Sequence, residues 1–244
     1  MQGLQGRRIV VTGAASGIGC AIARRLHDEG ADLGLMDVNS DGLDELALEG
    51  AMPLPTDITD REQVEAAFER FGDVEGLVNC AGWDRMVTFL DSTPELWRQV
   101  IDINLYGTLN VTHAALRRMN EAPSASIVSI ASDAGRVGSS GEAVYSACKG
   151  GMIALMKTLA REHARQGIRC NTVCPGPTDT PLLAEMGRDG GLGERIAPAL
   201  ARAVPMRRLG QPDDYAGIVA FLLSDDAAFI TGQTISVSGG LTMA

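Results

Sequence analysis

Short apolar runs alternate with longer stretches in which apolar residues recur every three or four positions, and the alternation continues along the chain. Short runs bounded by turn residues predict buried strands, and the wider spacing predicts amphipathic helices. Strands separated by helices are typical of a parallel sheet with helices on both faces. We therefore predict one doubly wound α/β domain over residues 1–244. Its seven expected strands are Ile9–Val11, Leu33–Met36, Ala51–Leu54, Gly76–Val78, Ser126–Ile130, Ile168–Cys174 and Thr234–Val237.

Helices are expected between these strands, and residues that favour helix ends mark where some of them begin or stop. Thr59 and Glu62 have the spacing of a capping box, in which two side chains satisfy free N–H groups at a helix start. Pro94 suits the first turn of a helix that begins near Thr93. Further helices are expected from Gly17 to Gly30, from the region of Tyr145 to about Gly167, and from about Pro212.

The alternation breaks down over residues 175–207, where prolines and glycines are frequent. An irregular segment of this length within a compact domain is usually a lid or a binding loop, with or without short helices. We assign it to a substrate lid. No internal repeat or linker divides the chain, so the lid belongs to the same domain.

The balance of charge narrows the range of partners. The chain has 21 lysines and arginines against 31 aspartates and glutamates, a formal net charge of −10. A basic surface for nucleic acid or anionic lipid is therefore not expected, and small diffusible molecules are the expected partners. No apolar run reaches the length of a membrane span, and no signal-peptide core precedes the first strand, which indicates a cytoplasmic protein.

The cysteines and histidines do not indicate a metal site or a disulfide framework. The five cysteines are scattered and odd in number, and the three histidines have no partners at ligand spacing. A secreted disulfide scaffold normally has an even number of cysteines. We expect free thiols and no metal.

A glycine-rich loop, Thr12-Gly-Ala-Ala-Ser-Gly-Ile-Gly19, joins the first strand to the first helix. Its glycines let the backbone approach a pyrophosphate, and the amides at the helix start attract the negative charge. Alone, such a loop is a weak signal, because a plain tight turn can have the same residues. Here Asp37 follows at the end of the second strand, where a carboxylate binds an adenosine ribose and repels a 2′-phosphate. We therefore predict a Rossmann-type domain that binds NAD rather than NADP.

Tyr145 and Lys149 are four residues apart, which places them on one face of a helix. A cation beside a phenol favours the phenolate, so Lys149 is expected to lower the pKa of Tyr145. A tyrosine with such a pKa exchanges a proton with an alcohol or a ketone. The alternative for an isolated pair is two surface side chains.

The glycine loop has the TGxxxGIG form, and in this the sequence resembles the short-chain dehydrogenase/reductase family. The resemblance extends from Gly6 to Gly240. It implies that Asn104, Ser132, Tyr145 and Lys149 form the catalytic tetrad of the family. Ser129 competes with Ser132 for the serine position, but the family spacing selects Ser132. The serine would hold the substrate oxygen, and the asparagine would support a proton path to the lysine.

Further segments match the cofactor site of the family. Asp57-Ile-Thr59 resembles its adenine-contacting segment, Asn79-Cys-Ala-Gly82 its NNAG segment with Cys80 in place of the second asparagine, and Pro175–Thr180 its PGxxxT segment. The resemblance implies that NAD is bound by Gly13, Ser16, Gly17, Ile18, Gly19, Asp37, Asp57, Ile58, Asn79, Ala81, Gly82, Tyr145, Lys149, Pro175, Gly176, Thr178 and Thr180.

Substrate choice is expected to depend on Trp83, on Arg136 and on the lid. Trp83 either forms a pocket wall or covers the sheet edge. Arg136 either contacts an acyl-CoA or is a solvated surface residue. Within the family, three stretches resemble those of enzymes that oxidise a cyclic β-hydroxyacyl-CoA to the β-ketoacyl-CoA. They are Ala81–Arg85, Ser132–Tyr145 and Cys174–Thr180.

The leading hypothesis is an NAD-dependent oxidoreductase that interconverts a secondary alcohol and a ketone. A 3-oxoacyl thioester reductase that acts on acyl carrier protein is one alternative, but it normally uses NADPH, which Asp37 disfavours. A dehydrogenase of a free secondary alcohol is another. A non-catalytic dinucleotide sensor would be expected to lack the tyrosine or the lysine. The resemblance also implies a homotetramer, formed by the long helices near 93–118 and 144–166 and the C-terminal segment.

Overall fold

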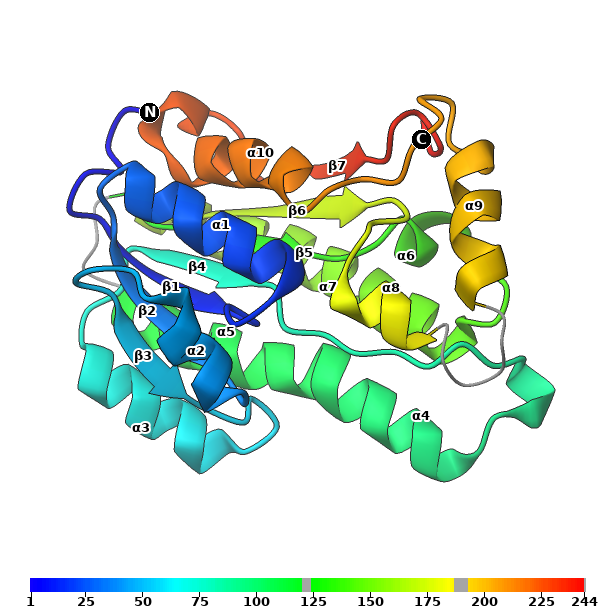
Figure 1. Ribbon diagram of the computed structural model, residues 1–244. Coiled ribbons are helices and arrows are strands. Elements are labelled where there is room, and N and C mark those ends of the chain that lie inside the picture. The colour runs from blue at the N-terminus through cyan, green and yellow to red at the C-terminus, as the bar shows by residue number, and fades with distance from the viewer. Residues whose placement is uncertain (120–123, 187–192, 244) are drawn as a thin grey trace.

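Within the residues that the computed structural model describes, 1–119, 124–186 and 193–243, seven strands form one sheet (Figure 1). They lie in the order β3-β2-β1-β4-β5-β6-β7. Every pairing between neighbours is parallel, as the alternation of strands and helices predicted. The strands are β1 (Arg8–Thr12), β2 (Asp32–Asp37), β3 (Met52–Pro55), β4 (Gly76–Asn79), β5 (Ser126–Ile130), β6 (Arg169–Pro175) and β7 (Thr234–Val237).

The central strands are buried on both faces, and their side chains alternate between two apolar cores. In β1, Ile9 and Val11 pack in one core, whereas Val10 packs in the other. This alternation is the period of two of an extended chain. Because helices cover both faces, the strand reads as a continuous apolar run, which is the pattern expected of a parallel sheet.

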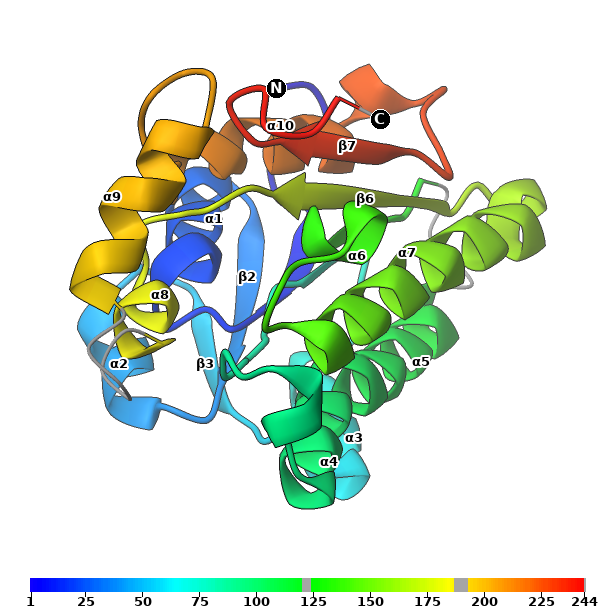
Figure 2. The same ribbon diagram turned by 90° about the vertical axis from the view of Figure 1, so that its right-hand side faces the viewer.

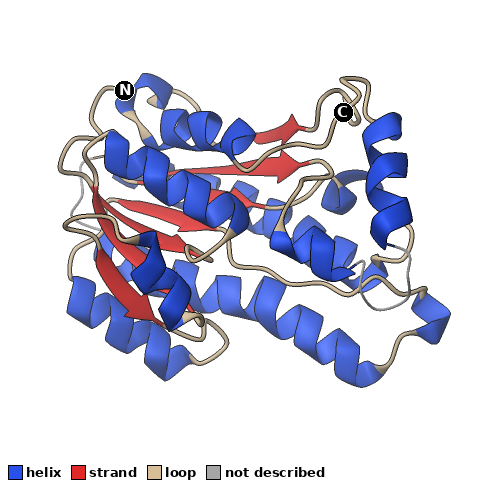
Figure 3. Ribbon diagram, in the orientation of Figure 1, coloured by secondary structure: helices blue, strands red, loops and turns tan. Residues whose placement is uncertain are grey.

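Helices form a layer on each side of the sheet, as Figures 2 and 3 show. Their apolar faces complete the two cores, which explains the spacing of three or four seen in the sequence. The core of Ile9 and Val11 is completed by α1 (Gly17–Asp28), α2 (Ser40–Leu46) and α10 (Asp213–Leu223). The core of Val10 is completed by α3 (Arg61–Phe71), α5 (Gly107–Met119) and α7 (Ala143–His163).

The strand order reverses between β1 and β4, which are neighbours in the sheet although β2 and β3 lie between them in the chain. At such a switch point the loops that leave the two strands turn to opposite sides, and a crevice opens at the carboxyl ends. The carboxyl ends lie toward the right in Figure 1. The shorter helices gather at this end: α4 (Pro94–Ile101), α6 (Ala134–Val137), α8 (Pro181–Met186) and α9 (Gly193–Ala203).

The capping box predicted for the third helix is wrong. Asp60, not Thr59, is the N-cap of α3, and its carboxylate accepts hydrogen bonds from the backbone N–H groups of Glu62 and Gln63. The Thr59 hydroxyl instead donates to Asp57 Oδ1 at 2.8 Å. Aspartate is an equally good N-cap residue, so the sequence pattern offered two starts one residue apart.

Several short helical elements were not predicted, among them α2 and a π-helical turn. Helix α2 is short, and its N-cap Asn39 accepts a hydrogen bond from the N–H of Gly42. The long helix that begins after Thr93 changes to a π-helical turn, η2, over Asp102–Tyr106 before α5 continues it. Such turns interrupt α-helices mostly at functional sites.

The segment expected to be a lid contains two short helices, α8 and α9, among the residues described. Residues 187–192 of this segment lie outside the described residues. The substrate-lid role of 175–207 is therefore a proposal that rests on the position of α8.

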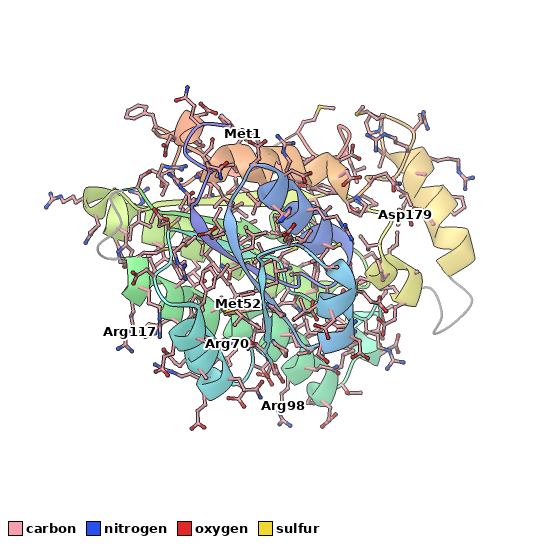
Figure 4. All side chains as sticks on the ribbon, turned by 60° about the vertical axis from the view of Figure 1, so that its left-hand side comes forward. Met1, Met52, Arg70, Arg98, Arg117 and Asp179 are labelled. Carbon is pink, nitrogen blue, oxygen red and sulfur yellow. The ribbon has the colours of Figure 1, made fainter. Side chains whose placement is uncertain are left out.

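Charged side chains project outward from the helices. Arg98 on α4 and Arg117 on α5 are exposed and point away from the sheet in Figure 4. In the part of the chain that the structure describes, no helix is both long enough and apolar enough to cross a membrane.

Candidate active site

A cavity of about 1110 Å³ lies at the carboxyl ends of the strands. It is lined by the glycine loop, by the residues that follow β2, β4, β5 and β6, and by one side of α8. The cavity lies at the topological switch point, where a doubly wound sheet usually binds its ligand. The volume is at the upper end of the range for ligand pockets, which suits a long ligand together with a smaller one.

The glycine loop is held against the end of β4. Thr12 Oγ1 accepts hydrogen bonds from the N–H groups of Cys80 and Ala81 at 3.0 and 3.1 Å. Gly13 has a φ of +68°, and a Cβ on it would lie 2.8 Å from the Cα of Ala81. Only glycine fits this backbone approach. This role of Thr12 was not predicted from the sequence, although its place at the end of β1 is a signal for one.

The carboxylate of Asp37 faces this loop. Its Oδ2 accepts a hydrogen bond from the N–H of Ala15 at 3.0 Å, and its Oδ1 accepts one from the N–H of Asn39 at 3.0 Å. Asp37 lines the cavity, as the sequence analysis predicted. It therefore presents negative charge on the side of the cavity next to the glycine loop.

The residues present fit a dinucleotide. Ser16, the N-cap residue of α1, makes no side-chain capping bond, so the first N–H groups of the helix are not satisfied by their own cap. These groups belong to Gly17, Ile18 and Gly19, which line the cavity. Unsatisfied amides at a helix start attract a phosphate. Asp37 beside them suits a ribose, so the loop and the carboxylate match the two parts of one ligand.

Ser132, Tyr145 and Lys149 converge on the other end of the cavity. Ser132 follows β5, while Tyr145 and Lys149 lie one turn apart on α7. The hydroxyls of Ser132 and Tyr145 are hydrogen-bonded to each other. Lys149 Nζ donates to the carbonyl of Ile130 at 3.0 Å and lies 5.4 Å from the centre of the Tyr145 ring. The phenol of Tyr145, the hydroxyl of Ser132 and the ammonium of Lys149 therefore lie together at this end of the cavity.

The expected lowering of the pKa of Tyr145 is not found. Burial raises the pKa of Tyr145, and the negative charges of Glu142 and Asp84 raise it further, while the hydrogen bond with Ser132 lowers it. Lys149 is itself 2% exposed, and burial lowers its pKa to about 8. Burial of the phenol is the main cause of the raised pKa and the two carboxyls add to it, and the sequence spacing of Tyr145 and Lys149 revealed neither.

Asn104 is fully buried in the π-helical turn and lies behind the cavity wall. Its Nδ2 donates to the carbonyl of Trp83 at 2.6 Å and to that of Val100 at 2.9 Å, while its Oδ1 accepts from the N–H of Trp83 at 3.3 Å. A Cβ on Gly82 would lie 2.9 Å from Asn104 Oδ1 and 3.3 Å from Lys149 Nζ. Asn104 thus fixes the segment that separates it from Lys149.

Two residues assigned from the sequence lie elsewhere. Asn79, the last residue of β4, is buried, and its Nδ2 donates to the hydroxyls of Thr112 and Ser129 at 3.0 and 3.1 Å. Arg136 donates to Ser236 Oγ at 2.5 Å and does not line the cavity, so the predicted substrate contact is not supported. The other residues assigned to the cofactor or the substrate do line it: Gly13, Ser16, Gly17, Ile18, Gly19, Asp37, Asp57, Ile58, Ala81, Gly82, Trp83, Tyr145, Lys149, Pro175, Gly176, Thr178 and Thr180.

The part of the cavity beyond Tyr145 is mainly apolar. Its lining residues from several segments include Trp83, Met86, Val137, Leu182 and Met186. Trp83 therefore belongs to a pocket wall, the first of its two predicted alternatives. A carboxylate residue, Glu142, interrupts this apolar surface. Sequence reasoning gave Glu142 no role, although it precedes Tyr145 by three residues.

Among the residues that the structure describes, no group of three or more histidine, cysteine, aspartate or glutamate side chains could hold a metal ion.

The sequence and the fold are similar to those of known oxidoreductases. A family profile described as enoyl-(acyl carrier protein) reductase matches residues 13–242. A 3-oxoacyl-[acyl-carrier-protein] reductase of Thermotoga maritima is 35% identical over 98% of this chain and 99% of its own. The cis-4-hydroxycyclohexanecarboxylate dehydrogenase of Sinomonas cyclohexanicum is 38% identical over 97% and 96%. A solved short-chain dehydrogenase/reductase of Brucella melitensis, titled glucose/ribitol dehydrogenase, has a TM-score of 0.89 and 35% identity over 98% of both chains.

Proposed function

The chain belongs to the short-chain dehydrogenase/reductase family, and from this premise we propose that it is an NAD-dependent dehydrogenase of a secondary alcohol. It is an oxidoreductase of alcohols and ketones. What we propose is its preference for NAD and the kind of alcohol that it oxidises. One observation carries the proposal. The hydroxyls of Ser132 and Tyr145 and the ammonium of Lys149 meet in a cavity whose other end is the glycine loop with Asp37.

NAD is supported over NADP by the charge at the adenosine end. Asp37 presents a carboxylate beside the N–H of Ala15, where a 2′-phosphate would place a second negative charge. The 2′-phosphate and the carboxylate of Asp37 would repel each other, whereas ribose hydroxyls donate hydrogen bonds to a carboxylate. When bound, the nicotinamide ring supplies the hydride chemistry of the reaction.

Tyr145 is proposed to handle the proton of the alcohol. As the phenolate it accepts the proton during oxidation, and as the phenol it gives the proton back during reduction. Ser132, bonded to the Tyr145 hydroxyl, holds the substrate oxygen in the same place. Because burial keeps the pKa of Tyr145 raised, oxidation is favoured at alkaline pH and reduction near neutral pH.

Lys149 and Asn104 are proposed to support this proton transfer. The ammonium of Lys149 lies close to the phenol ring and stabilises its negative charge electrostatically. Asn104 acts through the backbone of Trp83, which it holds with two hydrogen bonds. We therefore propose Asn104 as a positioning residue. It holds the segment that contains Trp83, which forms the cavity wall beside the π-helical turn.

The substrate is proposed to be a cyclic secondary alcohol. The apolar lining beyond Tyr145 suits a hydrocarbon ring, and a relative from Sinomonas is named for a hydroxylated cyclohexane ring. The likeness of three stretches to 2-hydroxycyclohexanecarboxyl-CoA dehydrogenase supports a cyclic β-hydroxyacyl-CoA as the narrower candidate. The similarity to the Thermotoga reductase supports a second candidate, the reduction of a 3-oxoacyl thioester.

A substrate panel tests the proposal. Initial rates are measured with cyclohexanol, a cyclic β-hydroxyacyl-CoA and a linear 3-hydroxyacyl-CoA, each with NAD⁺ and with NADP⁺. The proposal expects oxidation of a cyclic alcohol, free or as the thioester, with a preference for NAD⁺. Reaction of the linear thioester alone with NADP⁺ would instead support the reductase.

A homotetramer remains a proposal that comes from the family. Several apolar side chains on α4, η2 and α5 are exposed, among them Ile101, Tyr106 and Leu109. Exposed apolar residues along neighbouring helices are often covered by another subunit. Sedimentation velocity is expected to give four times the mass of the chain, and a value equal to one chain would contradict this.

A further inference from the structure

Glu142 occupies a position from which its carboxylate reaches the cavity rather than its own helix. It is the N-cap residue of α7, but its side chain makes no capping hydrogen bond. It lines the cavity beside Tyr145, which lies one turn further along the same helix. A carboxylate at a helix start that is not used for capping retains acceptor capacity for another donor.

A second carboxyl lies behind Glu142. Asp84 is 5% exposed and follows Trp83 on the loop after β4, and its side chain is a hydrogen-bond neighbour of the Glu142 carboxyl. Its Oδ2 is buried and has no hydrogen-bond partner among the described residues. The loop is held there because the N–H of Val87 donates to the carbonyl of Gly141 at 2.8 Å. Burial and the charge of Glu142 raise the pKa of Asp84 to about 7.

Of the two neighbouring carboxyls, Asp84 and Glu142, we expect Glu142 to be the ionised one. Two adjacent carboxyls bind one proton between them readily, and the buried member holds it because the charged form is costly away from water. A protonated Asp84 is neutral and does not compete with the substrate for the negative charge of Glu142. The remaining acceptor capacity of Glu142 is then directed to the cavity.

Positive charge is scarce in this part of the cavity. Among the described residues that line it, Lys149 alone carries a cation, and its Nζ is bonded to the carbonyl of Ile130. Arg136 is turned away to Ser236. An anionic group placed next to the reacting carbon would therefore meet the charge of Glu142, whereas a hydroxyl there would donate to it.

We propose that Glu142 determines specificity by accepting a hydrogen bond from a second hydroxyl of the substrate, on the carbon next to the one that is oxidised. The preferred substrate class is then a cyclic vicinal diol with an apolar remainder, and a free carboxylate at the same carbon is disfavoured. This inference rests on the proposed function, because it assumes that the alcohol binds beside Tyr145.

Three alcohols that differ only at one ring carbon test it: cyclohexanol, cis-cyclohexane-1,2-diol and 2-hydroxycyclohexanecarboxylate. For the unaltered protein with NAD⁺, kcat/KM for the diol is expected to exceed that for cyclohexanol by about tenfold to a hundredfold, the usual effect of a hydrogen bond to a charged group. The carboxylate should react more slowly than cyclohexanol. In Glu142→Ala the ratio of diol to cyclohexanol should fall to about one, mainly through KM.

Matched variants separate a local effect from general damage. Glu142→Gln keeps an acceptor but loses the charge, so it should retain part of the diol preference and raise the rate with the carboxylate. Glu162→Gln removes an exposed charge from the end of the same helix and should leave all three ratios unchanged. Quenching of Trp83 fluorescence by the diol, measured without turnover, should weaken in Glu142→Ala.

Two failures can be distinguished. If cyclohexanol, the diol and the cyclic β-hydroxyacyl-CoA are all left unoxidised with either dinucleotide, the proposed function fails and this inference fails with it. If cyclohexanol is oxidised but the ratio of diol to cyclohexanol is the same in Glu142→Ala and the unaltered protein, the specificity role of Glu142 is overturned while the proposed function stands.

Discussion

Asp37 Oδ2 accepts a hydrogen bond from the backbone N–H of Ala15 at 3.0 Å, so the end of β2 and the glycine loop share one polar contact. The carboxylate is thereby fixed next to the loop that would hold the pyrophosphate. Its charge, rather than its size, is expected to distinguish NAD from NADP.

Asp37→Asn tests this charge. The amide keeps an oxygen for Ala15 but no longer repels a phosphate, so the ratio of kcat/KM for NAD⁺ to that for NADP⁺ should fall by about tenfold or more. Asp32→Asn, an exposed change at the opposite end of β2, is the control and should not alter the ratio. An equal ratio in both variants would contradict the ribose role of Asp37.

Tyr145→Phe should remove proton transfer and leave dinucleotide binding in place. Loss of a general acid–base group typically lowers the rate by about 10²–10⁴-fold. Steady-state rates and a binding titration with NADH measure the two effects separately. Tyr106→Phe, at a tyrosine that is 48% exposed, should keep the full rate. Comparable turnover by Tyr145→Phe and the unaltered protein would exclude the acid–base role.

The sequence predicted the parts of the fold that repeat a simple pattern. β5 and β7 were predicted with the bounds they have in the structure, because both are short segments in which β-branched and hydroxyl residues predominate. The glycine loop and Asp37 were placed correctly because their spacing follows from one strand–helix–strand unit. Helix α2 and the π-helical turn were missed because short or distorted helices carry no periodic signal.

The site was harder to predict wherever long-range packing decides it. Asn79 is the last residue of β4, but the hydroxyls of Thr112 and Ser129 are buried beside it and bind its amide away from the cavity. The raised pKa of Tyr145 depends partly on Asp84, which is distant in the chain. Contacts of this kind between separate segments are not visible in local spacing.

Arg169 is expected to stabilise the end of α10. It begins β6, is 7% exposed, and donates to the carbonyls of Leu222 at 2.6 Å and Ser224 at 3.0 Å. Arg169→Met removes both of these hydrogen bonds and leaves the Leu222 carbonyl with only the Ser126 hydroxyl as donor, which should lower the free energy of unfolding by about 2–3 kcal/mol. Urea denaturation measures the change. Arg161→Met, an exposed change on α7, should have almost no effect.

Asp84 should make stability depend on pH. Its pKa is raised to about 7 in the folded protein, against an ordinary value of 3.8, so between these values the folded state holds a proton that the unfolded chain has released. The free energy of unfolding should therefore fall as pH rises from about 4 to about 7, by at most about 4 kcal/mol.

Denaturation by urea at several pH values between 5 and 8 measures this decline. Asp84→Asn cannot ionise, so the difference between this variant and the unaltered protein should grow in favour of the variant as pH rises. Asp73→Asn, at an exposed position, provides the control. A constant difference across the range would contradict a buried, protonated Asp84.

The charge of Glu142 should also affect the pH dependence of catalysis. Burial and the neighbouring carboxylate of Glu142 both raise the pKa of Tyr145, and oxidation needs the phenolate. The rate of cyclohexanol oxidation should therefore increase with pH into the alkaline range.

In Glu142→Gln one cause of the raised pKa is lost while burial remains, so the rise should move to lower pH by roughly half a unit to one unit. Profiles of kcat/KM against pH measure the shift, with Glu162→Gln as the matched control. A profile that does not move would show that the Glu142 carboxylate does not act on the phenol, and the raised pKa would then be due to burial and Asp84.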